Sequence, residues 1–186
     1  MNETMCIAPP RPDEYCHYYH QYISKAPAKD FLCVFEDQVR QLRQELGNLS
    51  DDQVNCLHVP YTWTLKQVIG HLIDVERIFS YRMLRIASGD QTPIPGYEQD
   101  SYVDSRNYQS VSMTSLLDEL EHLRMANVML VRRLSSEDLE RKGVASGHTT
   151  SARANLFILA GHVVHHAEII KRRLYPAGSN KNCDPL

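Results

Sequence analysis

Apolar residues recur at helical spacing along most of the chain. Large apolar side chains fall three and four positions apart, the spacing that places them on one face of a helix. The pattern predicts long helices over about residues 28–46, 65–89, 113–135 and 151–174. Because no alternating run of β-branched residues occurs, we expect an all-α fold in which these helices pack as a four-helix bundle.

Local signals mark where these helices begin and end. Thr64 and Gln67 form a capping-box pair before the second long helix, and Ser151 is the expected N-cap of the last one. Gly47 is typical of the position after a helix, and Pro176 cannot continue one. The sequence therefore indicates helix boundaries as well as helix faces.

The chain divides into a bundle and two shorter ends. Residues 1–27 are expected to be an N-terminal extension, partly helical, because a proline precedes tyrosines at near-helical spacing. Residues 28–176 would form the bundle, and residues 177–186 a disordered tail. The short helical extension is thus an addition to the four principal helices.

The segment between the second and third helices is long and interrupted by prolines and glycines. It is too punctuated for regular structure, and its length allows a crossover connection between the helices. Loops of this length in compact domains are usually functional or disordered. Within it, Pro93–Tyr102 mixes aromatic and acidic side chains and is a candidate pocket lid, although a dimer contact would explain it equally well.

Composition limits the partners and the compartment. The 186 residues fit one domain, and the formal charge of −3, without a long basic run, argues against nucleic acid or an anionic membrane surface as partner. A small-molecule substrate is the expected partner. The five cysteines contain no C-x-x-C pair, and there is no signal peptide or apolar membrane span, so we expect reduced thiols and a cytoplasmic location.

Three histidines stand in the stretch GHVVHH, on an otherwise apolar helix face. His162 and His166 are four residues apart and project side by side, whereas His165 points partly elsewhere. The third ligand of a metal site would come from His71 in VIGHLID, on the second long helix. A glycine precedes both His71 and His162, which suggests that the two helix backbones approach closely there.

A buried histidine is more often a hydrogen-bonded core residue than a ligand, but the H-x-x-x-H pair favours a metal. Three imidazoles leave at least one coordination position open, as in catalytic sites, and suit zinc or nickel. The stretch lacks the glutamate of H-E-x-x-H, so a general base for metalloprotease chemistry is missing. A metal-bound thiol would need no such base.

The stretches WTLKQVIGHLIDVERIFSYRMLRIASGDQTPIPGYEQDSYV and ASGHTTSARANLFILAGHVVHH resemble the DinB-like superfamily of YfiT-type metal-dependent enzymes. The resemblance covers about residues 10–175 and includes RPDEYCHYYHQYI. It implies a DinB/YfiT-type four-helix bundle with long crossover connectivity, commonly a homodimer, in which His71, His162 and His166 bind a divalent metal. Relatives of this kind include S-transferases that use bacillithiol or mycothiol and a mycothiol-dependent maleylpyruvate isomerase.

Other polar residues are weaker candidates. His148, His165 and Arg82 are candidate catalytic residues, each with a plainer structural explanation as a helix-end, core or ion-paired group. Arg82, with Arg77 and Arg85, would receive an anionic thiol or a carboxylate substrate, although such arginines more often pair with neighbouring acids. Asp74 and Glu168 would orient metal-bound histidines, unless they are solvated surface charges.

The leading hypothesis is a divalent-metal-dependent enzyme with thiol-dependent S-transferase or isomerase chemistry, in which the metal activates a thiolate or water. A low-molecular-weight thiol would be its second cofactor. Two alternatives stay open: a non-catalytic metal-binding stress or structural protein, and a hydrolase that uses a metal-bound hydroxide.

Overall fold

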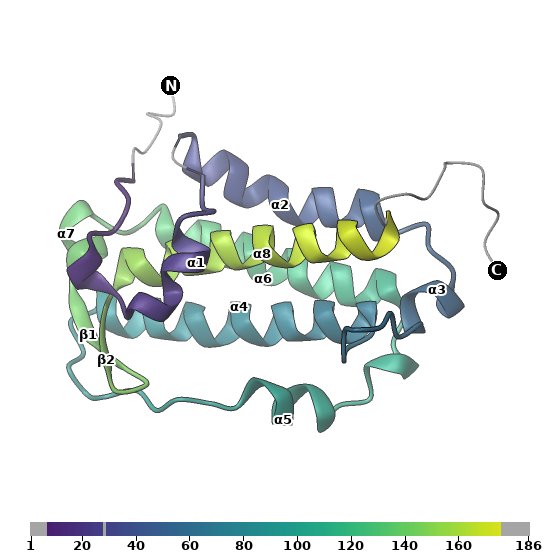
Figure 1. The fold of residues 1–186 in the computed structure, drawn as a ribbon. Coiled ribbons are helices and arrows are strands. Elements are labelled where there is room, and N and C mark those ends of the chain that lie inside the picture. The colour runs from purple at the N-terminus through teal and green to yellow at the C-terminus, as the bar shows by residue number, and fades with distance from the viewer. Residues whose placement is uncertain (1–6, 28, 176–186) are drawn as a thin grey trace.

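Four long helices form the body of the protein, as predicted. A computed structural model describes residues 7–27 and 29–175, and its long helices are α2 (Phe31–Leu46), α4 (Leu65–Ala87), α6 (Met113–Val131) and α8 (Ala152–Leu174) (Figure 1). Helix α4 packs against α6 and α8, and α2 packs against the same two helices. The all-α four-helix bundle is therefore confirmed. None of the helices in the described ranges is both long and apolar enough to cross a membrane.

The connections make this bundle differ from a simple up-and-down arrangement. In Figure 1, α2 and α8 run in one direction and α4 and α6 in the other, so the parallel helices α4 and α6 need a crossover. Residues 88–112 make it along the length of the bundle. The interruptions in this segment were expected to prevent regular structure, but it contains α5 (Gln99–Asp104) and the 3₁₀ helix η3 (Tyr108–Ser110).

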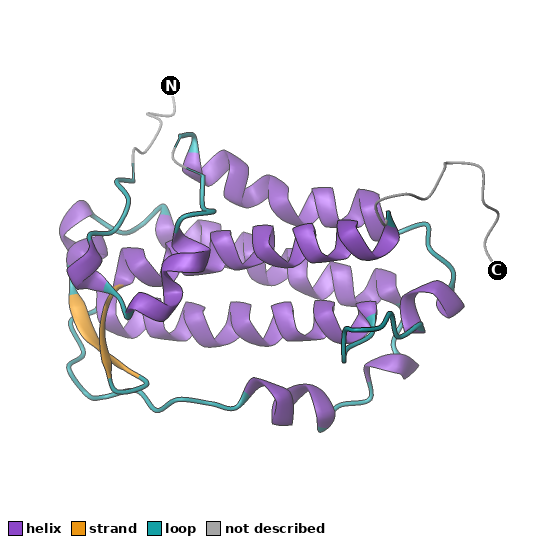
Figure 2. Ribbon diagram, in the orientation of Figure 1, coloured by secondary structure: helices purple, strands orange, loops and turns teal. Residues whose placement is uncertain are grey.

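A small hairpin corrects the expectation of a chain without strands. After α7 (Ser136–Glu140), strands β1 (Lys142–Ala145) and β2 (His148–Ser151) pair antiparallel at one end of the bundle (Figure 2). The turn residues Ser146 and Gly147 have φ of 54° and 79°, values typical of a type I′ hairpin turn. Strands of four residues are too short to show a repeating pattern, so the Ser-Gly turn is their main local signal.

The N-terminal extension is partly helical, as predicted, and it packs on the bundle. It contains η1 (Pro12–Glu14), η2 (His17–Tyr19) and α1 (His20–Ile23), and α1 lies against α8. Glu14 is fully buried and accepts hydrogen bonds from Ser151 Oγ at 2.8 Å and Arg153 Nε at 2.7 Å. The predicted disordered tail, residues 177–186, lies outside the described residues.

Polar side chains interrupt the apolar core near its middle. One apolar cluster lies around Phe35, Phe79 and Ile158, and the other around Leu72, Leu120 and Val163. Buried polar residues occur on each long helix and include Gln38, Glu76, Arg124 and His162. Because buried polar groups need partners, this level of the bundle is where chemistry or a specific hydrogen-bond network must be found.

The short α3 (Asp51–Asn55) connects α2 to α4 at the end of the bundle opposite the hairpin (Figure 1).

Candidate metal centre

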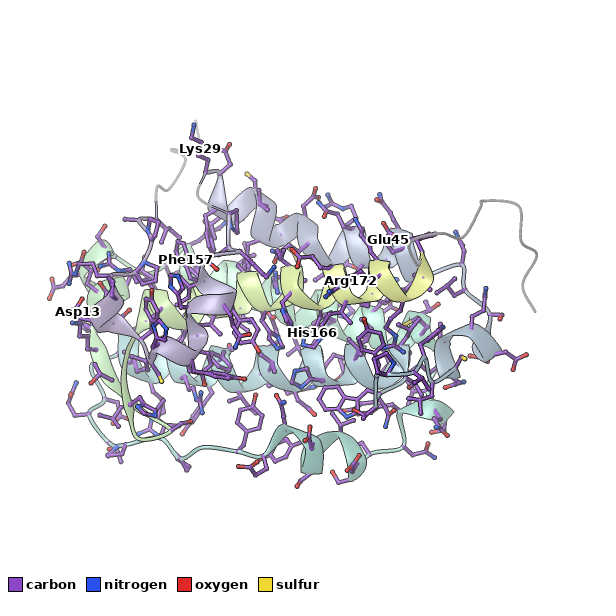
Figure 3. The ribbon with its side chains drawn as sticks, viewed as in Figure 1. Asp13, Lys29, Glu45, Phe157, His166 and Arg172 are labelled. Carbon is purple, nitrogen blue, oxygen red and sulfur yellow. The ribbon has the colours of Figure 1, made fainter. Side chains whose placement is uncertain are left out.

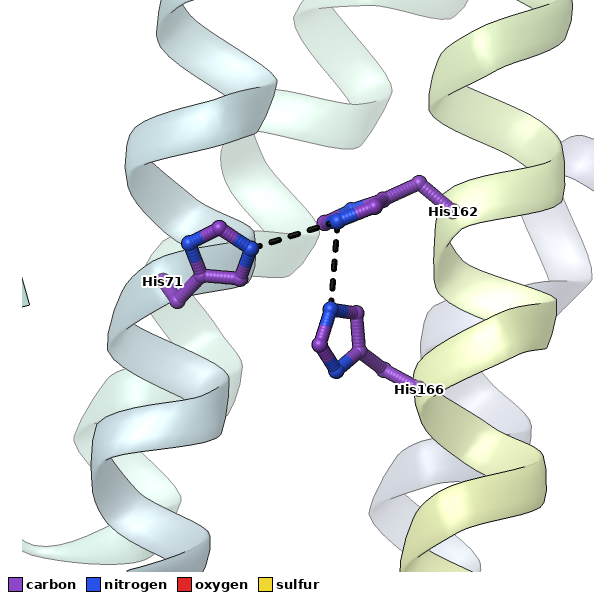
Figure 4. A group of neighbouring side chains, drawn as sticks. All are labelled: His71, His162 and His166. Carbon is purple, nitrogen blue, oxygen red and sulfur yellow. Dashed lines mark hydrogen bonds between the residues drawn. The ribbon is translucent and has the colours of Figure 1, made fainter. Parts of the chain in front are cut away.

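Three imidazole rings from two helices meet at one point. His71 projects from α4, and His162 and His166 project from adjacent turns of α8 (Figure 4). The Nε2 atom of His162 lies 3.2 Å from Nε2 of His71 and 3.1 Å from Nε2 of His166. Nitrogens bound to one tetrahedral zinc ion at about 2.0–2.1 Å would lie about 3.3 Å apart. The spacing of the three nitrogens therefore fits a shared metal ion.

The local sequence explains why these rings converge. Thr64 begins α4 as its N-cap, with Oγ1 accepting a hydrogen bond from the Gln67 backbone N–H at 3.2 Å. Two turns later, His71 faces α8, and the Trp63 ring packs beside it with 4.9 Å between ring centroids. In Figure 3 the His166 side chain lies between α8 and α4. The predicted Thr64 cap thus fixes the start of the helix that presents the third histidine.

Burial keeps the three imidazoles neutral. It lowers the pKa of His71 to about 4. Burial, followed by the neighbouring histidines, lowers the pKa values of His162 and His166 well below the ordinary value. Neutral imidazole is the form that binds a metal. Each Nε2 carries either one proton or one lone pair in the ring plane, so His162 Nε2 cannot satisfy both neighbours, whereas one cation could accept all three lone pairs.

The carboxylates expected to orient these rings have other partners. Asp74 is buried and accepts a hydrogen bond from the Tyr108 hydroxyl at 3.0 Å. Glu168 is half exposed and pairs with Lys25 at 2.5 Å. Within the described part of the chain, Nδ1 of His162 and Nδ1 of His166 are buried without a hydrogen-bond partner. Neither predicted orienting contact is therefore present.

The two glycines beside the histidines also act differently from the prediction. A Cβ at Gly161 would lie 1.8 Å from the backbone oxygen of Tyr22 in α1. A Cβ at Gly70 would lie 2.3 Å from the Tyr108 ring. The glycines therefore admit α1 and the crossover segment, and not the other metal-binding helix. Tyr22 and Tyr108 are far from these glycines in the sequence. The local pattern therefore predicted that some segment packs closely on each glycine, but it could not identify which segment.

A cavity of about 240 Å³ opens beside the histidines. His162 forms part of its wall, so a molecule in the cavity would contact one of the three histidines. Half of its other lining residues are aromatic: Phe79 and the tyrosines Tyr18, Tyr19, Tyr22 and Tyr97. Of the predicted lid, Tyr97, Glu98 and Asp100 line this cavity. The segment therefore lies at a cavity, and its role as a lid stays a prediction.

The tyrosines of the N-terminal extension are the main part of the site that sequence reasoning missed. Tyr22 packs its ring against His162 and His165, with centroids 5.0 Å and 5.2 Å apart. Burial raises the pKa of the Tyr22 hydroxyl above its ordinary value, so the group stays protonated at neutral pH. The helical spacing of these tyrosines indicated a helix, but nothing in it indicated contact with the last helix.

The weaker catalytic candidates lie in different places. His165 is half buried beside Tyr22 and does not belong to the converging group. His148 lies on the hairpin, exposed, next to a small hollow that it shares with Arg82. Arg77 pairs with Glu119 and Arg85 with Asp90, so both arginines form ion pairs with acidic residues, the alternative to binding an anionic ligand. Arg82 is buried and has no such acidic partner among the described residues.

Known proteins similar to this chain include several that are named as metal-dependent. A sequence model of the DinB superfamily matches residues 35–170. A protein of Oceanobacillus iheyensis named "putative metal-dependent hydrolase" is 31% identical over 141 residues, which are 74% of this chain and 80% of that protein.

Two solved structures share the fold over most of this chain. YfiT from Bacillus subtilis, described as a "probable metal-dependent hydrolase with an unusual four-helix bundle topology", matches with a TM-score of 0.66 and 19% identity, covering 89% of this chain and 92% of YfiT. A mycothiol-dependent maleylpyruvate isomerase matches with a TM-score of 0.63 and 16% identity, covering 78% of this chain and 61% of that one. At these identities the two structures establish similarity of fold.

Proposed function

Because the chain belongs to the DinB superfamily, we propose that it is a divalent-metal-dependent enzyme that acts on a small molecule with the help of a low-molecular-weight thiol, as an S-transferase or isomerase. The observation that carries this proposal is the convergence of three neutral Nε2 atoms beside a cavity. The isomerase with the similar fold is described as mycothiol-dependent, which supports the thiol.

His71, His162 and His166 would hold the ion, with zinc or nickel as the expected metals. When bound, a divalent ion supplies a Lewis acid that favours the deprotonated form of a thiol or water ligand. The protein itself contributes the cavity wall. Tyr22 covers His162 on one side and Trp63 covers His71, so water is excluded from two flanks of the site.

The choice of a thiol follows from the groups near the triad. In the described ranges, no Asp or Glu joins the three imidazoles. A water nucleophile is usually helped by a general base placed within hydrogen-bond reach, and a metal-bound thiol loses its proton without one. The protonated Tyr22 hydroxyl is suited to donating a hydrogen bond to the substrate and not to accepting a proton.

Hydrolysis is the second candidate, and two observations favour it. Glu98 and Asp100 line the same cavity and carry the carboxylates that a hydrolytic base would need. The relatives in Oceanobacillus and Bacillus carry the name "putative metal-dependent hydrolase". A third possibility, a non-catalytic protein whose metal holds α4 and α8 together, would keep the site and lack turnover.

Turnover assays with the metal-loaded protein separate these functions. We expect consumption of an electrophilic substrate, such as a maleyl compound or an activated halide, only when a low-molecular-weight thiol is added. Turnover of esters or amides without thiol would instead establish hydrolysis. Loss of folding on chelation, with no turnover under either condition, would establish a structural metal. His162→Ala should abolish any turnover, and His165→Ala should retain it because His165 lies outside the converging group.

A further inference from the structure

Arg82 is a buried guanidinium without an acidic partner. Its side chain in α4 is 2% exposed. Two other buried arginines, Arg124 and Arg153, pair with the buried carboxylates of Glu76 and Glu14. The ion pairs within residues 7–27 and 29–175 include none with Arg82. A buried charge that lacks a counter-charge is costly, so its presence calls for a reason outside the core packing.

The surroundings of Arg82 fix the guanidinium but leave it partly unsatisfied. Its Nη2 donates to Ser146 Oγ in the hairpin turn at 2.8 Å and lies 3.4 Å from the carbonyl oxygen of Pro95. Its Nε is buried and has no acceptor in the described part of the chain. A guanidinium held in this way keeps a fixed positive charge and an Nε–H donor without an acceptor, and a carboxylate oxygen could supply both the counter-charge and the acceptor.

The guanidinium lies on the side of α4 that carries the metal site. Arg82 follows His71 by three helical turns and shares its face. The side chain packs over the Phe79 ring at 4.9 Å and near the Tyr97 ring at 5.9 Å. Phe79 and Tyr97 both line the cavity that His162 also lines. Phe79 lies two turns, about 12 Å, along α4 from His71.

A second, smaller space adjoins Arg82. It has a volume of about 10 Å³, roughly the volume that one water-sized group requires. Its polar walls include His148, Thr150 and Asn155, and Tyr19 and Phe79 line both this space and the larger cavity. There is therefore room for a carboxylate oxygen beside the guanidinium, next to the end of the cavity formed by Phe79 and Tyr97.

We propose that Arg82 binds the carboxylate of an elongated small molecule whose other end reaches His71, His162 and His166. This inference rests on the proposed function and deepens it, because it specifies the ligand as an anion whose charged group is remote from the reacting group. The ion pair between Arg82 and the ligand carboxylate selects which molecules bind, and the three histidines act on the other end of the molecule.

A series of straight-chain ω-mercapto acids, from mercaptopropionate to mercaptoundecanoate, tests the distance and the charge together. Each acid is compared with the mercapto alcohol of equal length on protein loaded with cobalt, whose charge-transfer absorption reports a thiolate on the metal. We expect acids of intermediate length to bind roughly tenfold more tightly than the matched alcohols, since hydrogen bonds to charged groups have about this effect. Arg82→Met should abolish the preference, and Arg82→Lys, which retains the charge without the fork, should reduce it.

The same titrations separate the failure of this inference from the failure of the proposed function. If cobalt absorption changes but acids and alcohols bind equally at every length, the assignment of Arg82 is wrong and the thiol site stands. If no thiol changes the absorption, the thiol-dependent function is wrong and the ligand assignment falls with it. Arg85→Met, one turn along and paired with Asp90, is the matched control and should keep the preference for acids.

Stability gives a readout that needs neither metal nor ligand. Removing an uncompensated buried charge should raise the melting temperature of Arg82→Met by several degrees. Arg124→Met, which leaves the Glu76 carboxylate buried without its counter-charge, should lower it. A melting temperature that falls in both variants, or an Arg82→Met protein that does not fold, would assign Arg82 a structural role and overturn the proposal.

Discussion

His71 Nε2 and His162 Nε2 lie 3.2 Å apart although their helices are separated by the crossover segment, α6 and the hairpin. Their contact depends on how α4 is rotated and packed against α8. Changes that disturb either helix should therefore alter metal binding, and changes of similar size elsewhere should alter stability alone.

Thr64→Ala tests this dependence at the start of α4. Loss of the N-cap hydroxyl should cost about 1 kcal/mol of unfolding free energy and should also weaken metal binding, because the first turns of α4 carry His71. Ser112→Ala is the matched control, since Ser112 caps α6 through the Ser115 backbone N–H at 3.1 Å. Equal metal affinities in the two variants, measured by chelator competition, would contradict the prediction.

Gly161→Ala should displace α1. The added Cβ would meet the backbone of Tyr22 at 1.8 Å, and overpacking of this kind costs about 1–3 kcal/mol. We expect the displaced α1 to leave the side of His162 that it covers. Faster proteolysis within α1, measured by limited digestion and mass spectrometry, reports this displacement. Gly70→Ala meets the Tyr108 ring instead and should leave the digestion of α1 unchanged. Protection of α1 in both variants would show that the N-terminal helix does not depend on this contact.

The buried ion pair between α4 and α6 should respond strongly to the loss of one partner. Arg124 donates to Glu76 through Nε at 2.8 Å and Nη2 at 2.9 Å, with both side chains 1% exposed. Glu76→Gln leaves the guanidinium without its charge partner and should cost about 3–5 kcal/mol in urea unfolding. The double variant Glu76→Leu with Arg124→Met should recover much of this loss. A double variant as unstable as the single one would mean that the surrounding hydrogen bonds dominate.

The metal-free protein should lose stability as the pH falls from about 6.5 toward 4. The folded-state pKa of His71 is lowered by burial to about 4, so the unfolded chain binds more protons in this interval and protonation favours unfolding. The stabilising contribution is complete above the ordinary pKa of 6.5, and its loss amounts to about 3 kcal/mol for this one residue. Unfolding free energies of His71→Gln, measured across this range, should depend less steeply on pH. An unchanged slope would contradict the assignment.

The helices and their caps could be predicted from the sequence because the signals are local. The Thr64 and Ser151 hydroxyls accept hydrogen bonds from the backbone N–H groups of Gln67 and Ala154, within three residues in each case. The convergence of His71 with the H-x-x-x-H pair could be anticipated because three imidazoles on apolar helix faces need polar partners, and one metal ion can be the partner of all three. The homodimer and the cytoplasmic location stay predictions.

The rest depends on contacts between distant segments. The tyrosines of the extension lie beside the histidines because α1 packs on α8. Glu14, held by Ser151 and Arg153, also joins the extension to the bundle, and no local pattern indicates these contacts. The hairpin strands are too short for periodicity to reveal them. The same limit explains why Arg77, Arg82 and Arg85 were alike in sequence, whereas only the packing shows that Arg82 is buried without a carboxylate among the described residues.

Metal content measured for the wild-type protein beside His162→Ala and His165→Ala tests the central claim most directly. Protein purified from medium with equal zinc and nickel should hold about one divalent ion per chain. His165→Ala should hold as much, and His162→Ala should lose the ion on dialysis because its Nε2 contacts both other nitrogens. Full metal content in His162→Ala would contradict the assignment of His71, His162 and His166 as the metal site.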